Sequence, residues 1–219
     1  MFPLKDENPT RTKPVLTIFL IVVNTAIFIA SYLSGSFEGI VDSYGMKPAL
    51  VLKGKELYTI FTSMFLHGGF LHIFGNMLYL WIFGDNLEDA LGRPKFLLFY
   101  FLSGIVAGLA HAFYVIGDPI ASKLPTIGAS GAISGVLGAY IVLYPRARVL
   151  TAVMYSGIIM IPAIFFLGFW FLLQVLSVSF SWVAGGSSGV AYWAHIGGFV
   201  AGAVMIYPLR KSIKRRQAL

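Results

Sequence analysis

The sequence predicts an all-α membrane protein of six transmembrane helices with both termini in the cytoplasm. Of its 219 residues, 58% are hydrophobic and only 11% are charged, whereas a soluble domain has about 45–50% apolar and 25% charged residues. Several uncharged runs reach the roughly 20 residues that a helix needs to cross a bilayer. The basic residues also gather in alternate connections, as they do in multi-span proteins.

The first uncharged run covers residues 15–36 and follows Lys5, Arg11 and Lys13. Its apolar length exceeds the 7–15 residues of a signal-peptide core, so we expect an uncleaved span. Residues 35–56 carry several charges and are predicted to form a partly helical loop.

Five more spans are expected. The second, third and fourth are predicted at residues 70–83, 96–116 and 128–144. A short polar connection is expected after the second span, where the charged residues are Asp85, Glu88, Asp89, Arg93 and Lys95. Residues 149–209 contain no Asp, Glu, Lys or Arg. They are long enough for a fifth and a sixth span joined at the Ser- and Gly-rich residues 181–189.

Charge predicts the orientation. One side of the bundle carries twelve Lys and Arg and the other only four, which places both termini in the cytoplasm. The chain then divides into an amino-terminal tail at 1–14, a membrane domain at 15–209 and a basic tail at 210–219 that can contact anionic lipid. The net charge of +7 is dispersed, which argues against a nucleic-acid partner. Because cysteine is absent, disulfides, thiolate metal sites and a cysteine nucleophile are excluded.

Polar side chains in membrane helices are costly, although hydrogen bonds between helices are a common reason for them. Those that stand out are His72, Asn76, Ser130 and His195. The predicted topology places His72, Ser130 and His195 near the outer ends of the even-numbered helices. Asn76 lies one turn deeper than His72 on the same face. We expect the four to converge in one shallow, outward-facing pocket.

Stripes of small residues offer a reason for Ser130 and His195 to meet. Ser130 shares a face with the step from Gly131 to Gly135, and His195 with the step from Gly198 to Gly202. Small residues let helix backbones approach closely. If the stripes face each other, the two side chains come within hydrogen-bond distance. Packing without catalysis would also account for such steps, which are frequent in membrane helices.

The residue types favour serine chemistry. A serine needs a base, a neutral histidine can act as one, and an amide with a second histidine can donate to an oxyanion. No Asp or Glu lies in a predicted span, which excludes an aspartyl intramembrane protease. An H-E-x-x-H zinc motif is also absent, because Gly68 follows His67 and Ile73 follows His72. We therefore predict a Ser-His dyad without the third carboxylate of a triad.

These motifs resemble the rhomboid intramembrane serine proteases. Residues 128–131 resemble the GxSG motif of that family, 194–202 its AHxxGxxxG motif, 67–76 its second-helix pattern and 88–93 its connection into the third helix. The resemblance implies a rhomboid-like bundle with Ser130 as nucleophile and His195 as base. His72, Asn76 and the Ser130 backbone N–H would line the oxyanion hole. It also implies cleavage of single-pass membrane proteins near the outer end of their helix, with no cofactor and no metal.

The sequence departs from the family at two places. No Trp-Arg pair occurs in residues 35–66, and Ser134 stands where many members have an aromatic residue that packs on the histidine. His67 is expected to have a structural role, and Asn24 and Gln174 are expected to bond to backbone or neighbouring helices. The aromatic residues of the fifth span are predicted to face lipid; these are Phe165, Phe166, Phe169, Trp170 and Phe171. The resemblance suggests instead that the fifth helix gates lateral substrate access.

Two other function classes stay open: an inactive relative that binds membrane helices, and a small transporter or channel. Both Ser130 and His195 are present, which argues against the first. The second is disfavoured because histidine is the only ionisable residue within the predicted spans. The basic termini and the lack of a targeting presequence favour a prokaryotic plasma membrane.

Overall fold

The computed structural model describes residues 1–154, 157–183 and 190–217, and these are mostly helical. The long helices are α1 (Val15–Leu33), α5 (Phe70–Leu91), α6 (Arg93–Val115), α7 (Ser130–Leu143), α8 (Ala163–Val183) and α9 (Tyr192–Ile206). The short ones are α2 (Phe37–Tyr44), α3 (Pro48–Val51), α4 (Thr59–Thr62), η1 (Ser63–Phe65), η2 (Ala121–Lys123), η3 (Tyr207–Leu209) and α10 (Arg210–Gln217). The strands are β1 (Phe2–Asp6), β2 (Arg148–Val153) and β3 (Gly157–Pro162).

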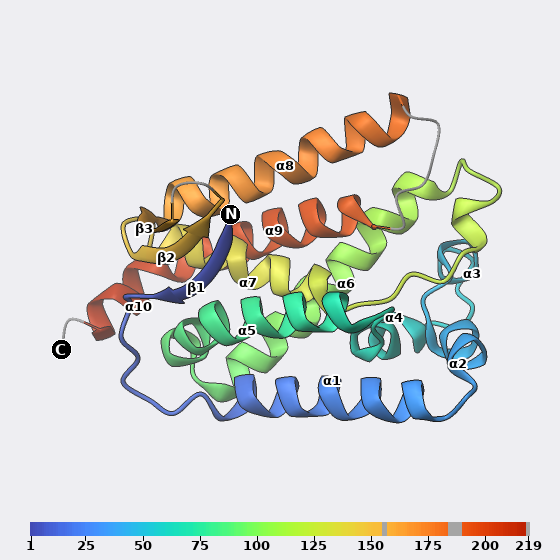
Figure 1. Cartoon of the computed structure of the whole chain (residues 1–219), viewed down its shortest axis with the longest axis horizontal. Coiled ribbons are helices and arrows are strands. Elements are labelled where there is room, and N and C mark those ends of the chain that lie inside the picture. Colours follow the sequence, from blue (N-terminus) through green and yellow to red (C-terminus); the bar gives the residue numbers. More distant parts are fainter. Residues whose placement is uncertain (155–156, 184–189, 218–219) are drawn as a thin grey trace.

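Helix α7 is the centre of the bundle. It packs against α5, α6 and α9, and residues 131–140 are all buried. A helix that is apolar on every side belongs in such an interior position. Figure 1 shows the sheet at one end of the bundle and α2 to α4 at the other. We call these the sheet end and the α2–α4 end.

The long helices are those of an integral membrane protein. Among the described residues, three helical runs are long and apolar enough to cross a membrane: Val15–Leu33, Arg93–Val115 and Tyr192–Ile213. Helix α7 and most of α8 are shorter apolar helices. Large apolar side chains are exposed on α1, α5 and α8, among them Phe19, Leu71 and Phe165. The count of six spans and the orientation stay predictions.

The polar connection expected after residue 83 is helical instead. Helix α5 continues to Leu91, and only Gly92, with a φ of +78°, separates it from α6. The side chain of Glu88 is buried and accepts hydrogen bonds from the backbone N–H groups of Leu16 and Thr17, at 3.0 and 2.8 Å. These amides belong to the first turn of α1 and have no partner within that helix, so a carboxylate stabilises them. Glu88 is thus used inside the fold, at the start of α1, and not in an exposed polar connection.

The fifth span does not start at residue 149. Strand β2 pairs antiparallel with both β1 and β3, so the amino-terminal tail begins with a strand. Residues 149–154 alternate β-branched and other apolar side chains, residues 158–161 include three isoleucines, and Pro162 follows. β-Branched residues are enriched in strands. Helix α8 therefore begins only at Ala163. The junction between the last two spans was expected at residues 181–189. Of these, residues 184–189 lie outside the described part of the chain.

Asp6 fastens the sheet to the helices. Its buried carboxylate accepts hydrogen bonds from the Tyr140 hydroxyl of α7, at 2.5 Å, and from the Asn86 amide of α5, at 3.1 Å. Burial raises the pKa of the Asp6 carboxyl, and the hydrogen bond from Tyr140 offsets this rise only in part. The tail at 1–14 is thus built into the fold at the sheet end.

Candidate active site

Ser130 and His195 lie together at the α2–α4 end of the bundle. Ser130 is the first residue of α7, and His195 is in the first turn of α9. The Nε2 atom of His195 is 2.8 Å from the Oγ atom of Ser130. The two side chains, 65 positions apart in sequence, therefore share a hydrogen bond.

The glycine stripes bring these two helices together. A Cβ atom added at Gly198 would stand 2.1 Å from the Gly131 carbonyl oxygen, and one added at Gly202 would stand 1.9 Å from that of Gly135. Only glycine permits so close an approach of backbones. The two stripes therefore face each other, which is the condition under which Ser130 and His195 were expected to meet.

His72 and Asn76 face the same region from the start of α5. The Gly68 backbone N–H donates to Nδ1 of His72 at 3.2 Å, so the other ring nitrogen, Nε2, carries the proton of a neutral ring. A Cβ atom at Gly128 would stand 2.8 Å from that Nε2 and 3.6 Å from Ser130 Oγ. Gly128, whose φ is +126°, therefore leaves open the space between His72 and Ser130.

Asn76 is buried, and one N–H of its amide is engaged. Its Nδ2 donates to the His72 carbonyl oxygen at 3.1 Å. A primary amide has two N–H groups, so the second remains available to another acceptor. The backbone N–H of Ser130 can also donate to an acceptor outside α7, because the first amides of a helix have no partner within it.

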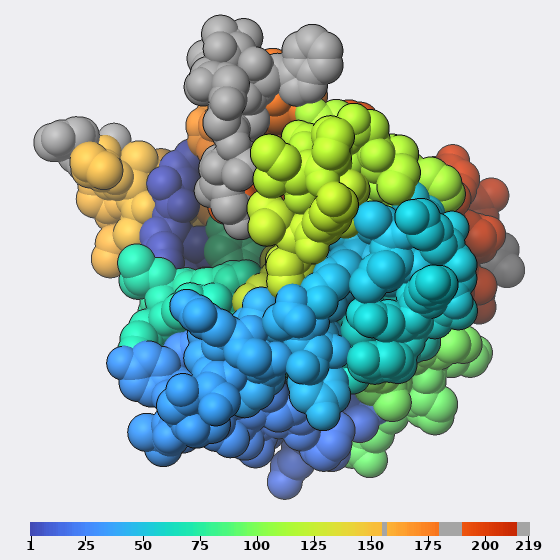
Figure 2. Space-filling view, turned by 90° about the vertical axis from the view of Figure 1, so that its right-hand side faces the viewer, coloured from blue at the N-terminus to red at the C-terminus, as the bar shows by residue number. Residues whose placement is uncertain are grey.

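All four predicted residues line one open hollow of about 830 Å³. Tyr79 and Trp170 contribute aromatic walls. Figure 2 faces the α2–α4 end, where the connections before α5 (blue to cyan) and between α6 and α7 (yellow-green) cover much of the surface. The predicted convergence of His72, Asn76, Ser130 and His195 is thus seen in the structure, whereas their chemical roles stay predictions.

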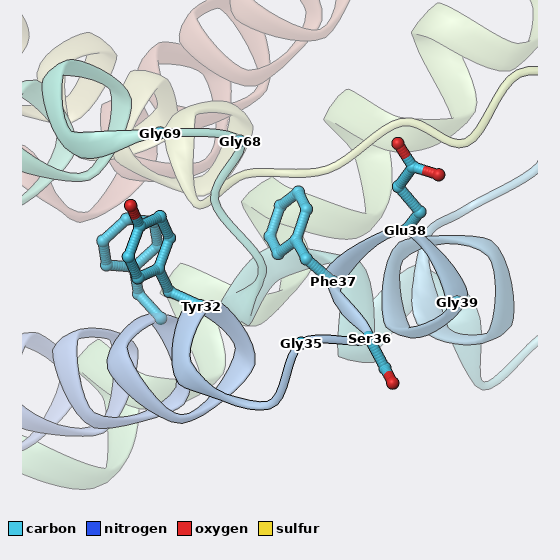
Figure 3. Close-up of a pocket in the computed structure, with 9 residues that line it drawn as sticks. Tyr32, Gly35, Ser36, Phe37, Glu38, Gly39, Gly68 and Gly69 are labelled. Atoms are coloured by element: carbon cyan, nitrogen blue, oxygen red, sulfur yellow. The ribbon is translucent and has the colours of Figure 1, made fainter.

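A second hollow, of about 630 Å³, adjoins the first at Gly68 and Gly69. It lies between the end of α1 and the start of α2. In Figure 3 the rings of Tyr32 and Phe37 rise from these two elements toward the Gly68–Gly69 link. The walls are mainly aromatic and glycine, with Glu38 as the charged side chain among the lining residues.

The surroundings of His195 agree with the expectation at Ser134 and differ from it at the aromatic residues of α8. Ser134 provides no ring, and its hydroxyl donates to the Ser130 carbonyl at 2.6 Å. The aromatic support comes from Trp170 of α8, whose ring centroid is 6.0 Å from that of His195. The prediction that the α8 aromatics all face lipid is therefore wrong for Trp170 and for Phe166, which is 2% exposed, although Phe165 is 68% exposed.

Gln174 of α8 is the residue whose importance the sequence did not reveal. Its Oε1 is 2.9 Å from Nδ1 of His195, and its Nε2 donates to the Trp170 carbonyl at 3.2 Å. The expectation that Gln174 bonds to backbone or a neighbouring helix is confirmed on both counts. A glutamine within a strongly apolar run was the available signal, but the partner on α9 could not be named from it.

His67 lies before α5 rather than on it, because the helix starts at Phe70. Its ring is buried and meets that of His72 edge-on, with centroids 5.1 Å apart. This contact agrees with the structural role expected for His67. Among the described residues, no group of three or more His, Asp or Glu lies close enough together to hold a metal ion.

Comparison with known proteins places the chain in a family. The family model described as "Rhomboid domain" matches residues 54–212. Rhomboid protein 1, mitochondrial, of Saccharomyces cerevisiae is 32% identical over 73% of this chain and 44% of its own length. Rhomboid protease GluP of Bacillus subtilis is 31% identical over 97% of this chain and 41% of its own length, and Rhomboid protease AarA of Providencia stuartii is 29% identical over 87% and 70%. The match therefore spans less than half of the yeast and Bacillus relatives. Because the family model covers most of this chain, the chain belongs to the rhomboid family.

Proposed function

We propose that this protein is an intramembrane serine endopeptidase that cleaves transmembrane segments of other membrane proteins through a Ser130-His195 dyad. The observation that carries the proposal is the 2.8 Å contact between His195 Nε2 and Ser130 Oγ. A serine hydroxyl becomes nucleophilic when an adjacent base can take its proton. The names of the relatives GluP and AarA, both rhomboid proteases, support the same class of reaction.

In the first half of the reaction, Ser130 Oγ attacks the scissile carbonyl carbon as its proton passes to His195 Nε2. The imidazolium then gives that proton to the leaving nitrogen, the C–N bond breaks, and an acyl-enzyme remains on Ser130. In the second half, His195 takes a proton from a water molecule that attacks the ester. Ser130 regains its hydrogen when the ester bond breaks.

The oxyanion of each tetrahedral intermediate would be stabilised by donors on two helices. The donors are the Nε2–H of His72, the second amide N–H of Asn76 and the backbone N–H of Ser130. The positive end of the α7 dipole lies at Ser130 and adds to this stabilisation. Such donors work best when they are held in place before the charge develops, as the Gly68–His72 hydrogen bond does for the His72 ring.

The substrates we propose are single-pass membrane proteins, cut near the outer end of their helix with water supplied from that side. Ser130, His72 and His195 each lie in the first turn of a helix at the same end of the bundle, which agrees with a shallow site. A substrate helix must unwind before it can be cleaved, so helix-destabilising residues such as Gly or Pro are expected near the scissile bond. Cytoplasmic termini and a prokaryotic plasma membrane stay predictions, since mitochondrial relatives also match.

The test uses purified full-length protein in liposomes with a fluorogenic single-span substrate. We expect cleavage of the substrate near the end of its span. We also expect covalent labelling by a fluorophosphonate, which loses fluoride as it bonds to Ser130 Oγ. Mass spectrometry locates the adduct, and heat-unfolded protein is the control for nonspecific reaction. A folded protein that neither cleaves nor labels would favour the inactive relative instead.

Asn76→Ala should lower kcat by about 10²–10³-fold, the usual cost of losing one oxyanion donor. KM should change little, because the ground-state carbonyl carries less charge than the oxyanion. Steady-state cleavage kinetics measure both constants. Asn24→Ala is the matched control: Asn24 also donates to the carbonyl one turn earlier, at 2.8 Å to Leu20, but it lies on α1 and does not line the hollow. Equal losses in the two variants would remove Asn76 from the oxyanion hole.

A further inference from the structure

The Gln174 side chain makes two hydrogen bonds with different consequences. Its Nε2 donates to the Trp170 carbonyl in its own helix. That bond alone would explain why a polar side chain is tolerated within an apolar helix. Its Oε1, however, is 2.9 Å from Nδ1 of His195 on α9. The amide oxygen is thus committed to the proposed catalytic base.

These contacts determine where the protons lie. The Trp170 carbonyl can only accept, so the amide nitrogen of Gln174 must face it and the amide oxygen must face His195. An amide oxygen also only accepts, so Nδ1 of His195 carries a hydrogen. A neutral imidazole has one N–H group, which leaves the lone pair on Nε2. Nε2 is the atom in contact with Ser130 Oγ.

We propose that Gln174 is a positioning residue that holds His195 in the Nδ1–H tautomer and aims its Nε2 at Ser130. The proposal rests on the protease function above and adds the group that orients its base. In a serine-protease triad a carboxylate has this task, and an amide that presents its N–H instead lowers turnover about 10⁴-fold through the wrong tautomer. Here the Trp170 carbonyl prevents that orientation of the amide.

An amide suits this location better than a carboxylate. Residues 149–209 contain no Asp or Glu, and an ionised group in a membrane helix is costly. Gln174 supplies an acceptor without a charge. Trp170, one turn earlier on the same face of α8, lies against the His195 ring and limits its rotation. Helix α8 therefore provides both an acceptor for Nδ1 and an aromatic neighbour for the ring of the base, whereas Ser134 provides neither.

Gln174→Leu keeps the size of the side chain and removes the acceptor. We expect kcat and the rate of fluorophosphonate labelling to fall about 10- to 100-fold, less than for a locked wrong tautomer, because a free imidazole samples both tautomers. KM and the melting temperature should stay near the wild-type values. Asn24→Leu is the matched control, since it removes a buried amide with the same bond to its own helix but with no partner for its oxygen among the described residues. It should leave kcat unchanged.

Gln174→Glu tests the mechanism by rescue. A carboxylate restores the acceptor and favours the imidazolium, so most of kcat should return. The acidic limb of the pH profile of kcat/KM should move to higher pH, because the base must lose its proton to work. A purely structural link between α8 and α9 predicts no such movement. Loss of thermal stability and a raised KM in both variants, with kcat and the pH profile unchanged, would overturn the proposal.

The tautomer can also be read without any reaction. In ¹⁵N-histidine-labelled protein, with the His195 signals identified by their absence from His195→Ala, we expect Nδ1 protonated in the wild type and a mixture of tautomers in Gln174→Leu. An Nε2–H tautomer in the wild type would refute the role of Gln174 whatever the cleavage assay shows. An Nδ1–H tautomer in a protein that cleaves nothing would refute the protease function instead.

Discussion

Replacing either member of the dyad, as Ser130→Ala or His195→Ala, is expected to lower the cleavage rate about 10⁴-fold or more. The reason is the contact between the two: the hydroxyl without its base is a weak nucleophile, and the base without the hydroxyl has nothing to activate. Because they act as a unit, the double variant should cleave no more slowly than the single variants. Single-turnover cleavage in liposomes measures all three rates.

Ser134→Ala is the matched control for this experiment. Ser134 is on the same helix one turn after Ser130, and within the described part of the chain its hydroxyl donates to the Ser130 carbonyl. It should cleave at close to the wild-type rate and should still label with the fluorophosphonate. Melting temperatures in detergent show whether each variant is folded. A folded Ser130→Ala variant with wild-type cleavage would contradict the dyad and the proposed function together.

The meeting of Ser130 and His195 could be predicted from sequence because two independent patterns agreed. Charge bias placed both residues at one depth, and the small-residue steps gave their helices a packing face. The structure confirms the face through the contacts of Gly198 and Gly202 with the carbonyls of α7. His72 and Asn76 could be added because one turn of helix fixes their common face.

The role of Gln174 could not be predicted, for a physical reason. Helix α8 is apolar on nearly every side, so no amphipathic pattern tells which side faces α9. Its partner depends on the rotation of α8 against α9. The sheet was missed for a related reason, since apolar periodicity alone does not distinguish a short strand from part of a span. The extension of α5 was missed because the Glu88 carboxylate serves the start of α1, far away in sequence.

The second large effect is expected from a single methyl group. In Gly202→Ala the new Cβ would stand 1.9 Å from the Gly135 carbonyl oxygen, well inside ordinary contact distance, and the obstacle is backbone rather than a movable side chain. Helices α7 and α9 must separate, at a cost of about 3 kcal/mol or more in unfolding free energy. Ser130 belongs to α7 and His195 to α9. A displacement of about 1 Å between the two helices should therefore also lower kcat about 10²-fold.

Gly168→Ala separates this effect from the general behaviour of glycine in helices. Gly168 is in α8, and apart from its chain neighbours and the adjacent backbone of that helix no described atom lies within 4 Å of the position of an added Cβ. An alanine there favours the helix by up to about 1 kcal/mol, so the melting temperature should stay the same or rise and cleavage should persist. Thermal unfolding and cleavage of both variants are measured in the same detergent. If Gly202→Ala were as stable and as active as Gly168→Ala, close approach of α7 and α9 would not be what holds the dyad together.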